Sequence, residues 1–156
     1  MSNQPRRVVT GLNAEGRSCI IIDGEVPVPQ GGMGVGMIWR TDAIPADNSG
    51  QDDPCGEPFG FDMMHAGGST FLTIEYPPGM GGEGEPGWHA TDTIDYIVVL
   101  TGEVVLMVED GEVTMKAGDF FVDRGVVHAW RNDGDVPTRI AVINLPSHPV
   151  GKGRTV

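Results

Sequence analysis

Two histidines and one aspartate are the residues whose types best suit catalysis or metal binding. His89 and Asp95 lie in the segment WHATDTIDY, and His128 lies further along the chain in RGVVHAWRN. Imidazole and carboxylate groups serve as general acids and bases, and they also bind divalent metals. We therefore predict that His89, Asp95 and His128 are the catalytic groups, acting either through a bound metal or by moving protons themselves.

Alternation along an extended chain predicts which side chains of the first segment point inward. His89, Thr91, Thr93 and Asp95 share one face, and the apolar residues at positions 97 and 99 continue it. This face is therefore the inner one. A buried histidine or aspartate must be paired, hydrogen-bonded or bound to a ligand. The structural alternative is a core histidine satisfied by a backbone carbonyl, with an aspartate that ties down turn N–H groups.

Neighbouring residues predict substrate contacts. Thr91 and Thr93 would position a substrate oxygen, and the rings of Trp88, Tyr96 and Trp130 would stack against an aromatic substrate. Each has a structural alternative, because threonine favours strands and large aromatic residues often fill cores.

The first segment resembles the first of two motifs of the cupin superfamily. That motif runs from a glycine through His-x-His and a glutamate to a closing glycine. Counted back from Gly102, Asp95 takes the glutamate position, Thr91 the second histidine position and His89 the first. The resemblance implies an all-β cupin fold, a double-stranded β-helix or jelly-roll barrel.

The second segment resembles the second cupin motif, in which a glycine leads through a turn to a histidine and an asparagine. Gly118, His128 and Asn132 fit it, while Arg124-Gly125 replaces the usual proline-containing turn and is one residue shorter. The two motifs cover roughly residues 70–145. The wording HxTxTIDY and RGxxHAWRN, with WRTDAIP upstream, is similar to a subgroup of small single-domain bacterial and fungal cupins. The resemblance implies that both motifs meet at one pocket.

A divalent metal is implied by the resemblance, but the ligand set is reduced. Metal-binding cupins supply three histidines and a glutamate. Here Thr91 replaces one histidine, and Asp95 has a reach shorter than glutamate by roughly 1.5 Å. His89, Asp95 and His128 would still bind Zn, Fe, Mn or Ni and leave positions open for substrate. A metal-free acid–base pocket is the alternative.

Charge and composition favour some partners and exclude others. Ten basic residues against 22 acidic ones give a net charge of −12, which disfavours nucleic acid. No run of about 20 apolar residues predicts a membrane span, and residues 1–10 lack the apolar core of a leader peptide. We expect a cytoplasmic protein with a small-molecule substrate. Cys19 and Cys55 lack metal-type spacing and are expected as free thiols or a disulfide.

Short strands are predicted throughout the chain, because its 24 glycines and 12 prolines interrupt a 39% hydrophobic sequence. Thr101-Gly102 and Asp110-Gly111 suit tight hairpin turns. The strand-like segments are Arg7–Thr10, Ser18–Asp23, Val35–Thr41, Thr70–Tyr76, Ile94–Leu100, Glu103–Glu109, Glu112–Met115, Phe120–Asp123, Val126–Arg131 and Arg139–Leu145.

One domain over residues 1–156 is predicted, with its barrel core at 70–145. The region 1–45 would supply strands that form a homodimer. The Pro-, Gly- and Asp-rich segment 42–62 predicts a long loop, which acts as a lid, a dimer contact or a solvated excursion.

The predicted function is that of an enzyme acting on a small organic molecule, aromatic or polyketide-like, in the barrel pocket. The reaction types that suit such a site are those of a lyase, dehydratase, decarboxylase or isomerase. A non-catalytic small-molecule-binding protein and an Fe-dependent dioxygenase are the alternatives.

Overall fold

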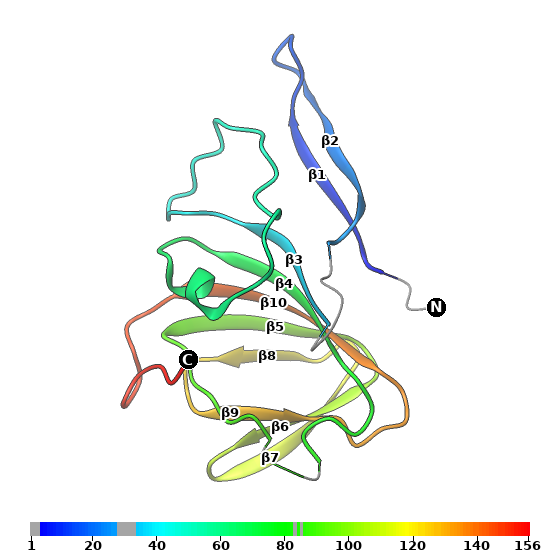
Figure 1. The fold of residues 1–156 in the computed structure, drawn as a ribbon, viewed down its shortest axis with the longest axis vertical. Coiled ribbons are helices and arrows are strands. Elements are labelled where there is room, and N and C mark those ends of the chain that lie inside the picture. Colours follow the sequence, from blue (N-terminus) through cyan, green and yellow to red (C-terminus); the bar gives the residue numbers. More distant parts are fainter. Residues whose placement is uncertain (1–3, 28–33, 83, 85) are drawn as a thin grey trace.

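The chain folds into ten strands and one short 3-10 helix over residues 4–27, 34–82, 84 and 86–156, which the computed structural model describes (Figure 1). The predicted all-β fold is confirmed, and each strand-like segment of the sequence corresponds to a strand. The elements are β1 (Arg6–Leu12), β2 (Ser18–Glu25), β3 (Gly34–Arg40), η1 (Phe61–His65), β4 (Thr70–Tyr76), β5 (Thr93–Thr101), β6 (Glu103–Val108), β7 (Gly111–Lys116), β8 (Phe120–Asp123), β9 (His128–Arg131) and β10 (Thr138–Pro146).

Two antiparallel sheets build the jelly roll. One has the order β3-β4-β10-β5-β8 and the other the order β7-β6-β9. Their inner faces share one apolar cluster, in which Leu72 and Ile97 of the larger sheet meet Leu106 and Trp130 of the smaller one. Among the described residues the strands form separate sheets rather than one closed ring of hydrogen-bonded neighbours. The site lies between these two sheets.

Strand β5 has the predicted alternation. Thr93, Asp95 and Ile97 are buried on its inner face, whereas Tyr96 and Leu100 are each 46% exposed on its outer face. On either side of Asp95 lie Asn144 of β10 and Asp123 of β8, which are its direct register partners. The centre of the larger sheet therefore carries polar side chains inside an otherwise apolar layer.

The turn between β8 and β9 makes β9 shorter than the predicted segment Val126–Arg131. The strand begins at His128 and not at Val126. Asp123 is the reason, because its Oδ1 accepts the N–H groups of Gly125 (3.0 Å) and Val126 (3.1 Å). These bonds hold the backbone in a turn. Gly125 has a φ of 77°, a conformation that suits glycine.

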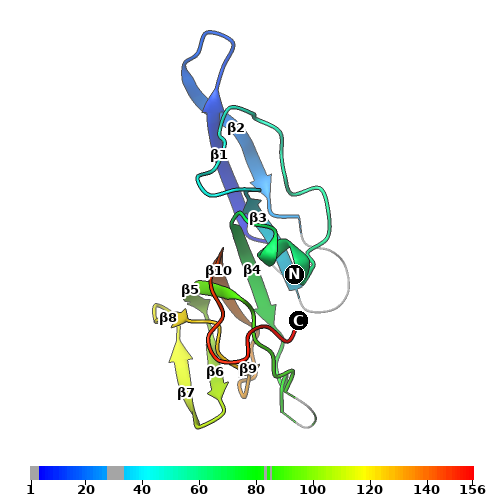
Figure 2. The ribbon, with the colours of Figure 1, turned by 90° about the vertical axis from the view of Figure 1, so that its left-hand side faces the viewer.

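The β1–β2 hairpin projects from the rest of the fold (Figures 1 and 2). Among the described residues its two strands pair only with each other. The loop before η1 packs against it, since the guanidinium of Arg7 pairs with Asp53 and Leu12 N–H donates to Gln51 Oε1. Residues 1–3 and 28–33 of the expected N-terminal region lie outside the described residues.

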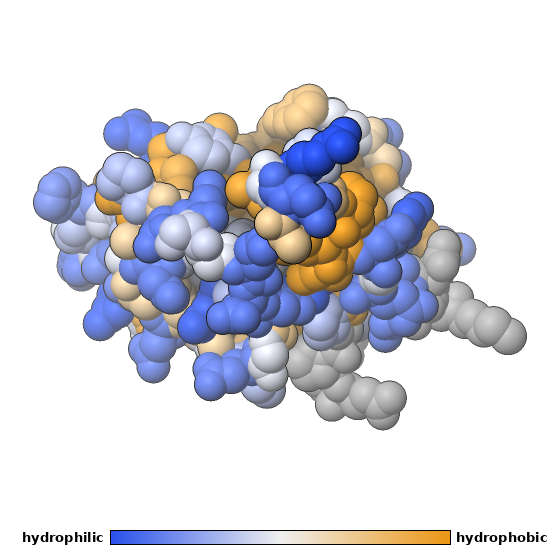
Figure 3. Space-filling model, turned by 90° about the horizontal axis from the view of Figure 1, so that it is seen from above, coloured by the Kyte–Doolittle hydropathy of each residue, from blue (hydrophilic) through white to orange (hydrophobic). Residues whose placement is uncertain are grey.

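Hydrophilic residues cover most of the surface seen from above, with apolar ones gathered in a smaller region (Figure 3). This agrees with the acidic composition. No helix in the described part of the chain is long and apolar enough to cross a membrane. Cys19 and Cys55 are free thiols, so the disulfide alternative does not apply.

Replacing Gly125 by alanine is expected to destabilise the fold more than replacing Gly118. Both glycines have positive φ, but a Cβ at position 125 would lie 2.7 Å from the Thr91 carbonyl oxygen, whereas position 118 has open space. Gly118→Ala should cost about 1–2 kcal/mol from backbone strain alone. Gly125→Ala should cost roughly 1–3 kcal/mol more because of the clash. Urea unfolding of the two variants measures the difference, and equal costs would contradict the close packing of this turn.

Candidate functional site

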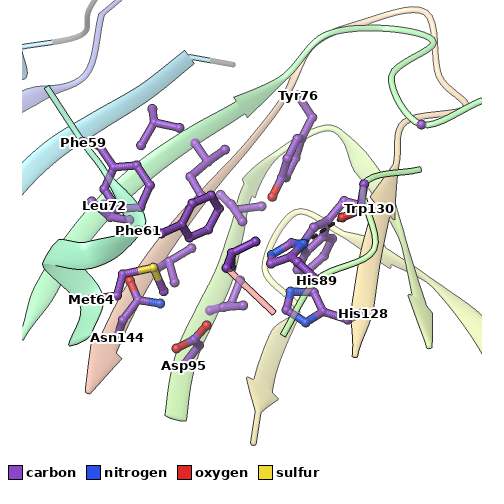
Figure 4. A pocket seen from close by; sticks show the side chains of 18 of the residues that line it. Phe59, Phe61, Met64, Leu72, Tyr76, His89, Asp95, His128, Trp130 and Asn144 are labelled. Atoms are coloured by element: carbon purple, nitrogen blue, oxygen red, sulfur yellow. Dashed lines mark hydrogen bonds between the residues drawn. The ribbon is translucent and has the colours of Figure 1, made fainter. Parts of the chain in front are cut away.

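One cavity of about 510 Å³ lies between the two sheets (Figure 4). Aliphatic side chains of β3, β4, β5 and β10 form one part of its wall, and aromatic rings and methionines form much of the rest. Its polar side chains are His89, Asp95, His128 and Asn144, together with the phenol of Tyr76. The remaining lining residues are Val35, Phe59, Phe61, Met64, Leu72, Ile74, Met80, Gly81, Pro86, Gly87, Trp88, Ile97, Trp130, Ile140, Val142 and Val156. Such a cavity suits an apolar small molecule with a few polar groups.

His89 and His128 are fixed opposite each other by their own backbones. His89 N–H donates to the His128 carbonyl at 3.0 Å, and His128 N–H donates to the His89 carbonyl at 2.9 Å, which forms an isolated antiparallel bridge. The two ring centroids are 4.4 Å apart. The resemblance to cupins implied that these residues meet, and they do so side by side in the cavity (Figure 4).

The remaining hydrogen bonds orient both imidazole rings. His89 Nδ1 lies 2.8 Å from the Gly87 carbonyl oxygen, and His128 Nδ1 lies 3.0 Å from the Val126 carbonyl oxygen. Because a carbonyl oxygen only accepts, these contacts assign a proton to Nδ1 of each ring. Nε2 of each ring is then the nitrogen left for a ligand. This is the arrangement that proton transfer requires.

Asp123 is a site residue that the sequence analysis did not identify. Its side chain is fully buried, and its Oδ2 lies 2.9 Å from His128 Nδ1. Since that Nδ1–H already donates to Val126, this contact is an ion pair, and Oδ2 has no well-aligned hydrogen-bond donor. The available signal was an aspartate before a tight Arg-Gly turn that leads straight to a histidine, because such a turn brings the two side chains together.

The surroundings shift the pKa values of the two histidines in opposite directions. Burial lowers the pKa of His89, and the positive charge of a protonated His128 would lower it further. Burial would also lower the pKa of His128, but the Asp123 carboxylate more than offsets this and raises it above the ordinary value of 6.5. Around neutral pH, His89 is therefore the neutral ring and His128 the one that favours a positive charge.

Asp95 hydrogen-bonds to residues of its own sheet. Its Oδ1 accepts the Thr93 hydroxyl at 2.6 Å, and the amide of Asn144 also hydrogen-bonds to it. Burial raises the pKa of Asp95 despite these two bonds, and the nearby Asp123 charge adds to the increase. Asp95 therefore lines the cavity as a carboxyl group whose pKa is raised above its ordinary value.

Three of the predicted substrate contacts lie outside the cavity wall. Thr91 and Thr93 are fully buried, and their hydroxyls hydrogen-bond to each other at 2.7 Å. The Thr93 hydroxyl also donates to Asp95, so the three side chains form one series of hydrogen bonds. Tyr96 lies on the outer face of β5, because strand alternation turns its side chain away from Asp95. Trp88 and Trp130 do line the cavity.

A metal does not fit the donor set that the chain presents. In the described part of the chain, no group of three or more His, Cys, Asp or Glu side chains is arranged to hold an ion. Thr91 stands where the resemblance expects a histidine, and its hydroxyl is bonded to Thr93. The carboxylate of Asp95 is bonded to Thr93 and Asn144. His89, Asp95 and His128 line one cavity without forming such a group in the described part of the chain, and a metal bound by these three residues stays a prediction.

Comparison with known proteins identifies relatives that extend over most of the chain. The family model for the cupin domain matches residues 72–144. Phomopsin biosynthesis cluster protein C' of Diaporthe leptostromiformis is 30% identical over 94% of this chain and 80% of its own length. Oryzines biosynthesis cluster protein J of Aspergillus oryzae is 43% identical over 56% of this chain, and the match spans only 48% of that protein. A cupin-domain-containing oxidoreductase of Neurospora crassa is 28% identical over 96% of this chain and 80% of its own length.

A solved structure agrees with the fold. A Klebsiella pneumoniae protein with a double-stranded β-helix domain superposes with a TM-score of 0.51, covering 78% of this chain and 84% of that one at 17% identity. At this identity the likeness concerns the fold alone. The family match, the relatives and the jelly-roll topology agree with one another, and the chain belongs to the cupin superfamily.

Proposed function

We propose that this cupin is an enzyme that moves protons on a small, uncharged organic molecule, with His89 as the base and His128 as the acid. One observation carries the proposal: two histidines with ring centroids 4.4 Å apart, in one apolar cavity, have pKa values shifted in opposite directions. Neighbouring titratable groups whose pKa values are driven apart are a recurring sign of an acid–base pair.

The reaction that such a pair supports is dehydration or isomerisation next to a carbonyl. Neutral His89 would take a proton from the carbon beside the carbonyl through Nε2. In a dehydration, the electron pair of that C–H bond forms a C=C bond, and the hydroxyl on the next carbon leaves as water with a proton from His128. In an isomerisation, the same proton returns at another carbon. Asp123 acts through His128, because its carboxylate favours the charged form of that ring.

The substrate class follows from the cavity wall. Its polar residues are two histidines, an aspartate, an asparagine and a tyrosine, and no lysine or arginine is among the described lining residues. Since His128 is already paired with Asp123, a carboxylate or phosphate would find no free cationic side chain among them. Aromatic rings such as Phe61 and Trp130 favour a flat or largely apolar substrate. The names of the relatives place two of those proteins in biosynthesis clusters. Together these observations support a cupin that acts on small molecules.

Oxidoreduction is the second candidate function. Three relatives at 27–28% identity, from Neurospora crassa, Hypocrea virens and Aspergillus ruber, are named cupin-domain-containing oxidoreductases. Such a reaction would need an electron carrier from outside the chain. Turnover that requires an added nicotinamide, flavin, or Fe(II) with O₂ would favour this candidate over proton transfer.

A homodimer formed through the β1–β2 hairpin is also proposed. Val8, Thr10 and Leu12 lie on one face of β1, and Ile20 of β2 is the register partner of Thr10. The three apolar side chains are 50–56% exposed. A two-stranded hairpin is only marginally stable alone in water. In a symmetric dimer a second copy would cover this face with its own Val8, Leu12 and Ile20. These side chains are uncharged, so they would not repel one another.

Replacing either histidine is expected to abolish proton transfer. The test follows deuterium uptake at the carbon beside the carbonyl of 4-hydroxy-4-phenylbutan-2-one, and its dehydration, by NMR in D₂O. His89→Gln and His128→Gln should each slow both by about 100-fold or more. The wild-type rate should be bell-shaped with pH, because His89 must be neutral, above its lowered pKa, while His128 must be charged, below its raised pKa. Asp123→Asn should move the alkaline limb to lower pH.

Tyr96→Phe is the matched control, since Tyr96 lies on the outer face of the same strand as Asp95. It should leave the rate unchanged. Binding of the ketone without any wild-type exchange would instead favour a non-catalytic binding protein. Exchange that is equally fast in both histidine variants would contradict the assigned roles.

Light scattering at micromolar concentration is expected to give twice the chain mass of 16.6 kDa. Ile20→Lys should reduce the mass to that of one chain, because it buries a charge in the proposed interface. Val113→Lys is the control, since Val113 is similarly exposed at 53% but lies on β7. A monomeric wild type would overturn the dimer.

A further inference from the structure

We propose that the segment 147–156 forms the rim of the cavity mouth and that Val156 is a specificity-determining residue, controlling which neutral apolar ligands enter. The inference uses the cavity of the proposed function but does not depend on its chemistry. The family match ends at residue 144, so this segment lies outside the matched region.

Exposure of the lining residues locates the mouth. Leu72 and Ile140, deep in the cavity, are 2% and 1% exposed, whereas Trp88 is 44% and Val156 is 42% exposed. A residue that both lines a cavity and contacts solvent lies at its opening. Trp88 adjoins His89 in the chain, so ligands that pass between Trp88 and Val156 arrive directly beside the histidine pair.

Hydrogen bonds hold the segment 147–156 against the residues that directly follow His89. Thr155 N–H donates to the Ala90 carbonyl at 2.9 Å, and Ala90 N–H donates to Thr155 Oγ1 at 2.9 Å. Ala90 is buried and directly follows His89. This reciprocal pair holds residue 155 in place and therefore determines where the side chain of Val156 lies.

Asp92 accepts hydrogen bonds from both ends of the segment 147–156. Its Oδ1 accepts the Arg154 N–H at 2.8 Å, and its carbonyl accepts the Ser147 N–H at 2.9 Å. Asp92 N–H also donates to His65 Nε2 at 3.3 Å. His65 ends η1, the helix that contributes Phe61 and Met64 to the cavity. The segment 147–156 is thus connected both to the residues beside His89 and, through Asp92 and His65, to η1.

Substitution of Val156 by tryptophan tests the proposal with a ligand that undergoes no chemistry. The probe is N-phenyl-1-naphthylamine, a neutral aromatic dye that fluoresces when it leaves water. Wild-type protein should bind it, and stopped-flow fluorescence gives the association rate. In Val156→Trp an indole narrows the mouth, so association should be about tenfold slower.

Val150→Trp is the matched control, because Val150 lies in the same segment, is 43% exposed and is not a lining residue. Its association rate should equal that of the wild type. If Val156→Trp behaves like Val150→Trp, or if the wild type does not bind the dye, the proposal is overturned. Dye binding without turnover would refute the proposed enzyme and leave the rim intact.

Thr155→Val provides a second measurement that does not depend on bulk at the mouth. Valine has a similar shape but cannot accept the Ala90 N–H, so the rim loosens while the apolar wall remains. We expect the dye to associate faster and to dissociate about fivefold faster, with an unchanged unfolding midpoint for the core. Unchanged rates for this variant would contradict a rim held by residues 90 and 155.

Discussion

The reciprocal backbone bridge between His89 and His128 is the constraint on which the site depends. Two main-chain hydrogen bonds, of 3.0 and 2.9 Å, join β9 to the segment that precedes β5, at the positions where the imidazoles branch. Side chains of directly paired residues point to the same face. The fold therefore brings both rings into one cavity, and the other features of the site act on this pair.

A buried carboxylate makes the two rings different. Asp123 raises the pKa of His128, while His89 experiences mainly burial, which lowers its pKa. In an apolar cavity a neighbouring charge acts strongly, because the surroundings screen it poorly. The two backbone carbonyls at Gly87 and Val126 then set which nitrogen of each ring carries the proton. Orientation comes from the main chain, and the difference in charge comes from one side chain.

Much of this arrangement was predictable from local patterns. Alternation of side chains correctly placed Thr93 and Asp95 on the inner face of β5, and turn residues correctly divided the strands. The meeting of His89 and His128 came from the resemblance, because no local rule predicts contacts across sheets. Asp123 was missed since its role depends on the turn that follows it. Tyr96 was assigned to the substrate although its own strand parity pointed it outward.

The protonation states of the two rings test the central claim most directly. Imidazole ¹⁵N chemical shifts at pH 6.5 distinguish a charged ring from each neutral tautomer, and the four histidines can be assigned with His65→Gln, His148→Gln and His89→Gln variants. We predict that His128 is mostly charged and that His89 is mostly neutral with its proton on Nδ1. Equal half-charged signals for both rings, or a charged His89 beside a neutral His128, would contradict an acid–base pair.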